Sequence, residues 1–357
     1  MHDIVIIGGG IAGISAAARL APHSDVLVLE AESHLAYHAS GRSAAAFIQD
    51  YGNSVIRALN TASFEYLSSA NGGVLSPRGM MMLGKALERE DFLIEVHDFG
   101  LSEISIEEAK HKVPLIDQNS VKFAAYRENV SDIDTDLFFQ NFLRIARAHG
   151  TKIKTDAKVT NINFENGTWH LVTAEQTYSA KMLVNASGAW VDQIAEMAGI
   201  GPLGFTPYRR SIARIPVPGG YDCTNWPLLD GVKESWYAKP DAGQLIVSPA
   251  DEDPIIAQDA WVDDMILAKG LSRFEEMMSN PVERVTSNWA GLRTFAPDRT
   301  LVIGRSPENP EFFWIAGQGG YGFQTAAAAS QLASELILGH EIELDDCICQ
   351  SLSPDRF

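Results

Sequence analysis

The chain has 357 residues, of which 46% are hydrophobic and 21% charged, a composition typical of globular proteins with enough apolar material for two ordinary domains or one large one. Its 28 basic and 46 acidic residues give a formal net charge of −18. A surface this negative repels phosphate backbones and anionic lipid headgroups, so nucleic acid and membrane surfaces are not favoured as partners, while a local basic cleft could still bind an anion.

The cysteines and histidines show no pattern of a disulfide framework or a metal site. Cys223, Cys347 and Cys349 do not have zinc-site spacing, and His34 and His38 have no third ligand near them. The first residues lack the basic segment of a signal peptide, and no stretch reaches the roughly 20 apolar residues of a membrane helix. We therefore expect free thiols, no metal, no integral membrane segment and a cytoplasmic location.

The N-terminal residues have the pattern of a dinucleotide-binding βαβ unit. An apolar run at 4–7 leads into Gly8-Gly-Gly-Ile-Ala-Gly13, an alanine-rich helical segment follows, and a second apolar strand ends at Glu30. Gly8 permits a tight turn, Gly10 lets backbone amides approach a pyrophosphate, and Gly13 lets the helix pack closely. The helix N-terminus directs partial positive charge at the phosphates, and Glu30 would accept hydrogen bonds from a ribose.

The next segments are less regular. Residues 37–45, Tyr-His-Ala-Ser-Gly-Arg-Ser-Ala-Ala, are mostly small and closely follow Glu30, which predicts a loop lying tightly along a cofactor. Met80, Met81 and Met82 are interpreted as part of a core strand at 79–83. The alternative is that one of the three faces a ligand. Helices are expected at 64–70, 88–99 and 104–112.

Asp132, Asp134 and Asp136 are spaced like the start of a calcium-binding loop. Leu137, however, stands where such a loop needs glycine. We therefore expect the aspartates to cap the strongly amphipathic helix predicted at 137–150.

The middle of the chain predicts a strand at 181–188, a helix at 191–198 and an antiparallel sheet over 205–254, where short apolar runs alternate with Pro and Gly. Gly199-Ile-Gly-Pro-Leu-Gly204 also fits G-x-G-x-x-G, but it follows a helix and contains Pro202. We interpret it as a helix end and exit loop.

Basic residues are informative in so acidic a chain. Arg209 and Arg210 stand together, and Arg293 ends the apolar stretch that begins at Trp289. A buried guanidinium needs an anionic partner, and a substrate carboxylate can bind it through two parallel hydrogen bonds.

A third glycine-rich segment, Gly317-Gln-Gly-Gly-Tyr-Gly322, lies between a predicted strand at 312–316 and a predicted helix at 323–338. It lacks a second strand with an acidic residue, so we expect a helix N-terminus directed at an anion or an electron-rich ring. Because there is neither a second complete dinucleotide motif nor a redox C-x-x-C pair, the pattern argues against a disulfide reductase.

The order of these segments predicts an α/β protein with a discontinuous nucleotide-binding part. We expect a Rossmann-like domain formed by 1–76, 131–206 and 288–357. Residues 77–130 and 207–287 are expected to form a second, α+β substrate-binding domain on a mixed or antiparallel sheet.

Several ordered blocks together resemble the FAD-dependent D-amino acid oxidase superfamily, most closely its D-arginine dehydrogenase-like members. The blocks are residues 37–45, 132–136, 184–190, 239–243, 289–293 and 318–325, and the resemblance runs through nearly the whole chain. It implies a non-covalently bound FAD, with the adenine half on Gly8–Gly13 and Glu30 and the flavin along Ala39–Ala46 and Gly319–Gln324. The implied cofactor-binding residues are Gly8, Gly10, Ala12, Gly13, Glu30, Ala31, Ser40, Gly41, Arg42, Ser43, Ala44, Ala45, Ala46, Val159, Gly319, Gly320, Tyr321, Gly322, Phe323 and Gln324.

The same resemblance implies the substrate site. Arg210, Tyr237 and Arg293 would hold a substrate carboxylate, Gly320 would offer a backbone contact, and Tyr51 would lie over the pocket. The implied activity is oxidation of the CH–NH2 group of a D-amino acid to an imino acid, by hydride transfer to the flavin, followed by hydrolysis to a 2-oxo acid and ammonia. The electron acceptor stays open between oxygen and a quinone-type compound.

Two alternatives remain beside this activity. The first keeps the fold and oxidises a secondary amine such as an N-substituted glycine, and the second is a flavin-carrying binding protein without amine oxidation. Three positions depart from the D-arginine pattern, because Met80 stands in place of an acidic residue, Asp230 in place of an apolar one and Ala46 in place of a histidine. Strict D-arginine specificity is therefore not expected.

Overall fold

The apolar N-terminal run forms the central strand of the first of two large sheets. In the computed structural model, which describes residues 1–357, β1 (His2–Ile7) pairs in parallel with β2 (Val26–Leu29) and with β12 (Thr177–Asn185). Its strand order is β10-β11-β12-β1-β2-β9, and β20 pairs with both β12 and β19. The remaining strands are β9 (Lys152–Lys154), β10 (Asn161–Glu165), β11 (Thr168–Val172), β19 (Val302–Arg305) and β20 (Phe312–Ala316).

Helices cover both faces of this sheet, which is why its central parallel strands are apolar throughout. One face carries α1, α5 and α8 with α2 beyond them, and their shared core includes the small side chains Ala17 and Ala327, which allow close helix packing. The other face carries α6 over Trp169 and Trp314. These helices are α1 (Ile11–Leu20), α2 (Ser54–Ser69), α5 (Thr135–Ala148), α6 (Val191–Met197) and α8 (Gly322–Leu338), and α9 (Asp346–Leu352) lies beside α2.

The second sheet has nine strands and is almost entirely antiparallel. Its order is β17-β13-β16-β15-β14-β5-β7-β6, β18 pairs with β13, and only β14 and β5 run parallel. The strands are β5 (Met80–Gly84), β6 (Ser102–Ile104), β7 (Phe123–Arg127), β13 (Thr206–Ile215), β14 (Leu228–Gly231), β15 (Tyr237–Asp241), β16 (Gln244–Ser248), β17 (Asp253–Pro254) and β18 (Ser287–Phe295). Its helices are α3 (Arg89–Asp98), α4 (Ile106–Lys112) and α7 (Asp264–Glu275).

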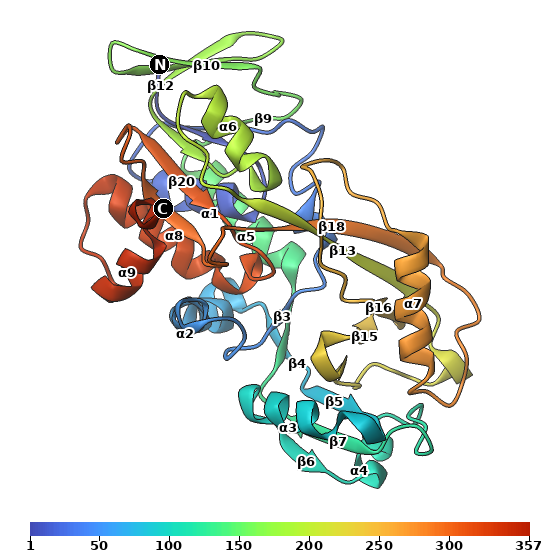
Figure 1. Cartoon of the computed structure of the whole chain (residues 1–357). Coiled ribbons are helices and arrows are strands. Elements are labelled where there is room, and N and C mark those ends of the chain that lie inside the picture. Colours follow the sequence, from blue (N-terminus) through green and yellow to red (C-terminus); the bar gives the residue numbers. More distant parts are fainter.

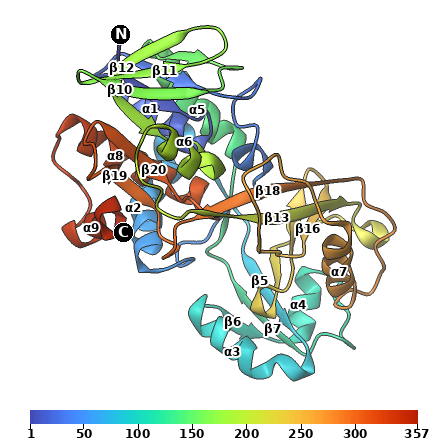
Figure 2. The ribbon, with the colours of Figure 1, turned by 45° about the horizontal axis from the view of Figure 1, so that its top comes forward.

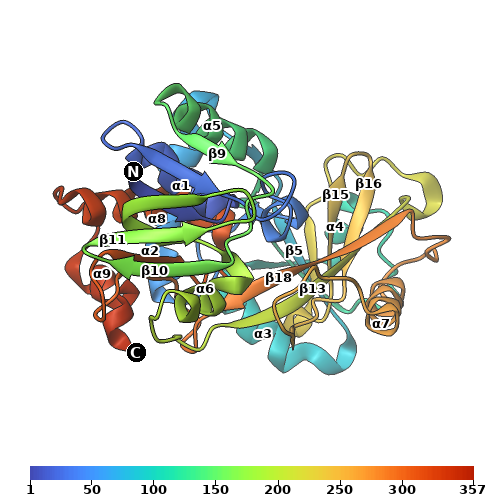
Figure 3. The same cartoon turned by 90° about the horizontal axis from the view of Figure 1, so that it is seen from above.

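The two sheets are joined by long strands. Figure 1 and Figure 2 show β13 and β18 running from beneath the first sheet into the second, with α7 beside the far end of these strands. Seen from above in Figure 3, the first sheet and the second lie on opposite sides of the molecule. A small third sheet of β3 (Ala46–Phe47), β8 (Ser131–Ile133) and β4 (Leu75–Pro77) carries the chain between them.

The elements predicted from sequence are present, with different limits at several ends. The helix expected at 64–70 begins ten residues earlier, because Asn53 caps it by accepting a hydrogen bond from the Ile56 amide at 3.0 Å. The helix expected from 104 begins at Ile106 after a Ser105 capping box. The strand expected at 181–188 spans Thr177–Asn185 and continues into a turn.

The predicted division of the chain into two domains agrees only roughly with the composition of the two sheets. Strand β18, which the predicted segment 288–357 includes, pairs with β13 along nine residues and is part of the second sheet. The domain boundaries stay a prediction. None of the helices has both the length and the apolar character needed to cross a membrane.

Of the three aspartates predicted to cap this helix, only Asp134 does so, whereas Asp136 lies in the first turn of α5 and Asp132 makes ion pairs. Asp134 is the N-cap and accepts a hydrogen bond from the Leu137 amide at 2.9 Å. Asp132 binds Arg78 and Lys239, each at 2.7 Å. No group of three or more His, Cys, Asp or Glu side chains is arranged to hold a metal ion.

Asp134→Ala should lower the free energy of unfolding by about 1 kcal/mol, because the first turn of α5 loses its side-chain acceptor. Asp134→Asn, which keeps a capping oxygen, should stay close to the wild type. Urea unfolding followed by circular dichroism measures both, and equal losses in the two variants would contradict the capping role.

Candidate active site

A cavity of about 620 Å³ is lined by residues of both sheets, a size usual for small-molecule and cofactor sites. One end is formed by the glycine motif and Glu30, and the other by Arg210, Asp230 and Arg293. Every predicted site residue lines this cavity except Gly13, Gly41 and Tyr321. The structure thus brings together residues from both ends and the middle of the chain.

The glycines of the first motif are needed for close packing. A Cβ on Gly8, whose φ is +112°, would lie 2.3 Å from the Ala186 carbonyl oxygen, and one on Gly13 would lie 2.0 Å from the Gly8 carbonyl oxygen. Gly13 therefore serves the contact between α1 and β1, and the structure explains why it is absent from the cavity wall. The N-terminus of α1 faces the cavity, where the Ser40 hydroxyl accepts from the Ile11 amide at 3.0 Å.

Glu30 lies at the end of β2 and is 9% exposed. Its carboxylate accepts hydrogen bonds from the Gly9 amide at 2.7 Å and the Glu32 amide at 2.9 Å. These bonds fix the carboxylate beside the glycine turn, where it borders the cavity. The arrangement fits a dinucleotide whose phosphates meet the α1 N-terminus and whose ribose meets Glu30.

The second glycine-rich loop lies between β20 and α8, as its sequence context predicts. Gln324 lines the cavity, and its side-chain oxygen accepts from the Ile48 amide at 2.7 Å, which fixes residues 43–48 against α8. Gln318 lines the same cavity, and its buried side-chain nitrogen has no hydrogen-bond partner. A buried donor of this kind is normally satisfied, so it fits a polar ligand at this position.

The two arginines predicted to bind a carboxylate lie on one face of the second sheet. Arg210 on β13 is directly opposite Gly291 on β18, and Arg293 is two residues further along β18. Alternate residues of a strand share a face, so the two guanidinium groups are diagonal neighbours over the cavity. Arg210 is 7% exposed, and its Nε and Nη1 have no hydrogen-bond partner.

Arg209 faces the other way. It binds Asp251 at 3.3 Å and Asp253 at 3.2 Å and does not line the cavity. Of the two adjacent arginines, the structure therefore assigns one to an ordinary ion pair and leaves the other free for an anion.

Aromatic side chains enclose the arginine end. Tyr51 and Tyr237 line the cavity, and the Tyr51 hydroxyl donates to Glu234 at 3.5 Å. Burial, together with the negative charge of Glu234, raises the pKa of Tyr51, so its phenol stays protonated. Tyr321 lies behind Tyr51 with ring centroids 5.4 Å apart and does not reach the cavity.

Gly320 gives Arg293 its space. A Cβ at this position would lie 3.1 Å from Arg293 Nη1, closer than ordinary contacts allow. Gly320 itself lines the cavity, so its backbone is exposed to any ligand there.

Sequence reasoning missed several cavity residues. Glu234 is in a short turn with φ of 46° and belongs to no motif, and Gln318 is hidden inside a glycine loop. Ala157 and Lys158, beside the predicted Val159, also line the cavity. Ala157 and Lys158 could have been indicated by the neighbouring Val159, and Gln318 by the neighbouring Gly319. Glu234 had no such signal in the sequence.

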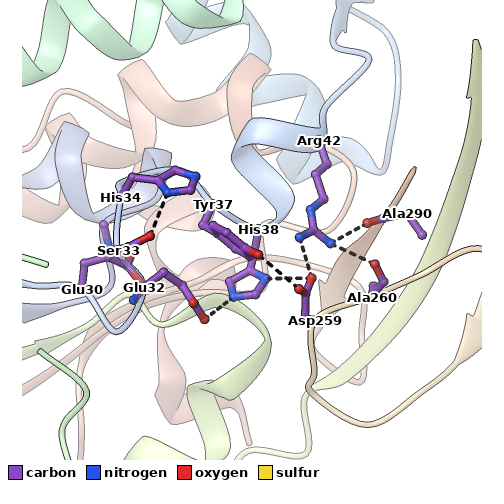
Figure 4. Close-up of polar contacts among 11 residues, drawn as sticks. Glu30, Glu32, Ser33, His34, Tyr37, His38, Arg42, Asp259, Ala260 and Ala290 are labelled. Carbon is purple, nitrogen blue, oxygen red and sulfur yellow. Dashed lines mark hydrogen bonds and ion pairs between the residues drawn. The ribbon is translucent and has the colours of Figure 1, made fainter. Parts of the chain in front are cut away.

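The loop of residues 37–45 is fixed to the second sheet by a network at the cavity mouth. Figure 4 shows Arg42 donating to the carbonyl oxygens of Ala260 (3.0 Å) and Ala290 (2.9 Å) and to Asp259 (2.5 Å). His38 binds Glu32 at 2.9 Å in the same view. His34 and His38 thus have separate partners, Ser33 for His34 and Glu32 for His38.

This network predicts unequal effects on binding of the expected flavin cofactor. Arg42→Ala should raise the Kd of the cofactor at least about tenfold, because three hydrogen bonds that position the loop are lost. Asp259→Ala should raise it by less than about fivefold, since its side chain is 56% exposed and exposed ion pairs contribute little. Titration of the cofactor into apoprotein checks both, and a larger effect at Asp259 would contradict the network.

Comparison with known proteins adds relatives at low identity. Human dimethylglycine dehydrogenase is 24% identical over 99% of this chain, and the chain spans 44% of that protein's length. N-methyl-L-tryptophan oxidase of Yersinia pestis is 23% identical over 93% of this chain and 94% of its own length. Glycine oxidase from Geobacillus kaustophilus has a TM-score of 0.83 with 21% identity, covering 100% of this chain and 99% of its own. This likeness confirms the predicted fold class.

A family model decides the relationship. The model described as FAD dependent oxidoreductase (DAO) matches residues 3–336, which confirms the resemblance drawn from the sequence blocks and the predicted cofactor, FAD. The chain therefore belongs to the DAO family of FAD-dependent oxidoreductases.

Proposed function

We propose that this FAD-dependent oxidoreductase oxidises the CH–NH2 group of a D-amino acid to an imino acid, which water converts to a 2-oxo acid and ammonia. The observation that carries the proposal is the free guanidinium of Arg210 beside that of Arg293, in the same cavity as the dinucleotide motif. Arginine forks bind the carboxylate of a small substrate through parallel hydrogen bonds. The D-configuration rests on the sequence blocks shared with D-arginine dehydrogenase-like enzymes.

The cofactor would be held by both glycine-rich segments. Its adenine half would lie against Gly8–Ala12, Glu30 and Val159, and its flavin against residues 40–46 and 319–324, all of which border the cavity apart from Gly41 and Tyr321. When bound, FAD supplies the acceptor for the hydrogen and the electron pair that leave the substrate carbon.

The chain's own residues would orient the substrate and set its charge. Arg210 and Arg293 fix the carboxylate, so the bond to be broken keeps one direction in the cavity. Met80, Ile48 and Leu228 belong to an apolar cluster that lines the same cavity. Apolar surroundings disfavour an ammonium ion, so they favour the neutral amine, whose lone pair is needed to form the imine.

A second candidate is oxidation of a secondary amine. The names of two relatives state substrates of this kind, dimethylglycine and N-methyl-L-tryptophan. The same arginines would bind the carboxylate of an N-substituted glycine, so the two candidates differ only in the amine.

Anaerobic reduction of the flavin decides between them. D-amino acids should reduce it at least about tenfold faster than their L-enantiomers, because a fixed carboxylate directs only one face of the carbon to the flavin. The first candidate also predicts faster reduction by D-amino acids than by N-methylglycine. Bleaching of the flavin absorbance measures each rate. Faster reduction by N-methylglycine would favour the second candidate, and no bleaching by any amine would overturn both. Reoxidation by oxygen and by a quinone then identifies the acceptor.

A further inference from the structure

Asp230 is a buried carboxyl group without a hydrogen-bond partner at Oδ1. It is 7% exposed and lines the cavity from β14, directly opposite Tyr237 on β15. A buried polar atom left unpaired is costly, so native structures rarely keep one without a reason. Its Oδ1 is therefore an acceptor that is open to a ligand in the cavity.

The surroundings of Asp230 are apolar on one side and charged on the other. Met80, Met82 and Leu228 lie on the paired strands β5 and β14, of which β14 carries Asp230, and belong to one buried hydrophobic cluster. Burial, and then the negative charges of Glu234 and Glu95, raise the pKa of Asp230 well above its usual value, although Arg210 acts in the opposite direction. Protonated or ionised, the carboxyl keeps an acceptor at its carbonyl oxygen.

Asp230 lies on the same sheet as Arg210 and Arg293, the proposed carboxylate-binding residues, but on a different strand. Strands β16 and β15 separate β13, which carries Arg210, from β14. Three strand spacings amount to about 14 Å between backbones, and both side chains line the cavity between them. A small substrate bound through its carboxylate at Arg210 and Arg293 would direct its remaining part toward Asp230.

We propose that Asp230 determines specificity by accepting a hydrogen bond from a donor at the end of the substrate that points away from the carboxylate. The donor is a hydroxyl, an amide NH2 or an ammonium group. A substrate that ends in a methyl group leaves Oδ1 unpaired, and sites built for a hydrogen bond reject such analogues strongly. This inference rests on the proposed carboxylate binding and adds the identity of the group that reads the other end of the substrate.

Matched substrate pairs test the assignment in the FAD-loaded enzyme. The pairs are D-threonine with D-valine, D-glutamine with D-methionine and D-lysine with D-norleucine, and the readouts are flavin reduction rates and Kd values from the change in flavin absorbance. In the wild type, the donor-bearing member of at least one pair should be favoured about tenfold or more. Asp230→Leu should reduce that ratio to less than about threefold, because no acceptor remains.

Asp230→Leu replaces an unpaired polar group with an apolar one of similar size and is expected to fold, and Asp230→Val serves as a second apolar variant. FAD content and Tm control for folding. Asp230→Asn keeps an acceptor without a charge, so a preference for hydroxyl or amide should survive in it and a preference for ammonium should disappear.

Failure of this inference and of the proposed function give different results. A wild-type ratio below about threefold in every pair, or a ratio unchanged in Asp230→Leu, overturns the role of Asp230 even when the flavin is reduced. If no amino acid reduces the flavin, the proposed function fails, and the Kd ratios of the same pairs still decide whether Asp230 reads the donor.

Discussion

The guanidinium groups of Arg210 and Arg293 line one cavity in a protein whose net charge is −18. The function of this cavity depends on what neutralises these two positive charges. Arg210 has two buried nitrogens without partners, although the chain has 46 acidic residues and pairs the adjacent Arg209 with two of them. Removing a charge from water without a partner is costly. We therefore infer that the cavity accepts an anion that comes from outside the chain.

The fold makes this site by joining two sheets with one antiparallel pair of strands. The pairing of β13 with β18 places Arg210 and Arg293 on one face, while the carboxyl ends of β1 and β2 bring the glycine turn and Glu30 to the opposite end of the cavity. Neither sheet contains the site alone. The network around Arg42 then ties the loop from the first sheet to the segment beside the second, so both halves of the cavity keep one relative position.

The sequence predicted those parts of the site whose signal is local. The strand, the glycine turn, the helix and Glu30 follow one another within 30 residues, and each serves as a marker for the next. Arg209 and Arg210 show where local reading ends, because only the pairing with β18 decides which of them faces the cavity. Glu234 belongs to no recognisable pattern, since a turn formed by distant contacts places it. Gln318 lies within a resemblance block, but the glycines around it defined the motif and it was not singled out. Helix α2 begins earlier than predicted because Asn53 caps it. Ser54 and Val55 are weak helix formers, so the sequence did not indicate a helix start there.

The most direct test of the anion site is the binding of a simple carboxylate that has no amine to lose. Titration of the FAD-loaded enzyme with propionate, followed by the change in flavin absorbance, should give saturable binding, whereas propionamide should bind at least about 100-fold more weakly because it brings no charge to the arginines. Arg293→Ala and Arg210→Ala should each retain FAD and lose most of the propionate affinity. Equal binding of the acid and the amide, or full propionate affinity in both variants, would contradict the account.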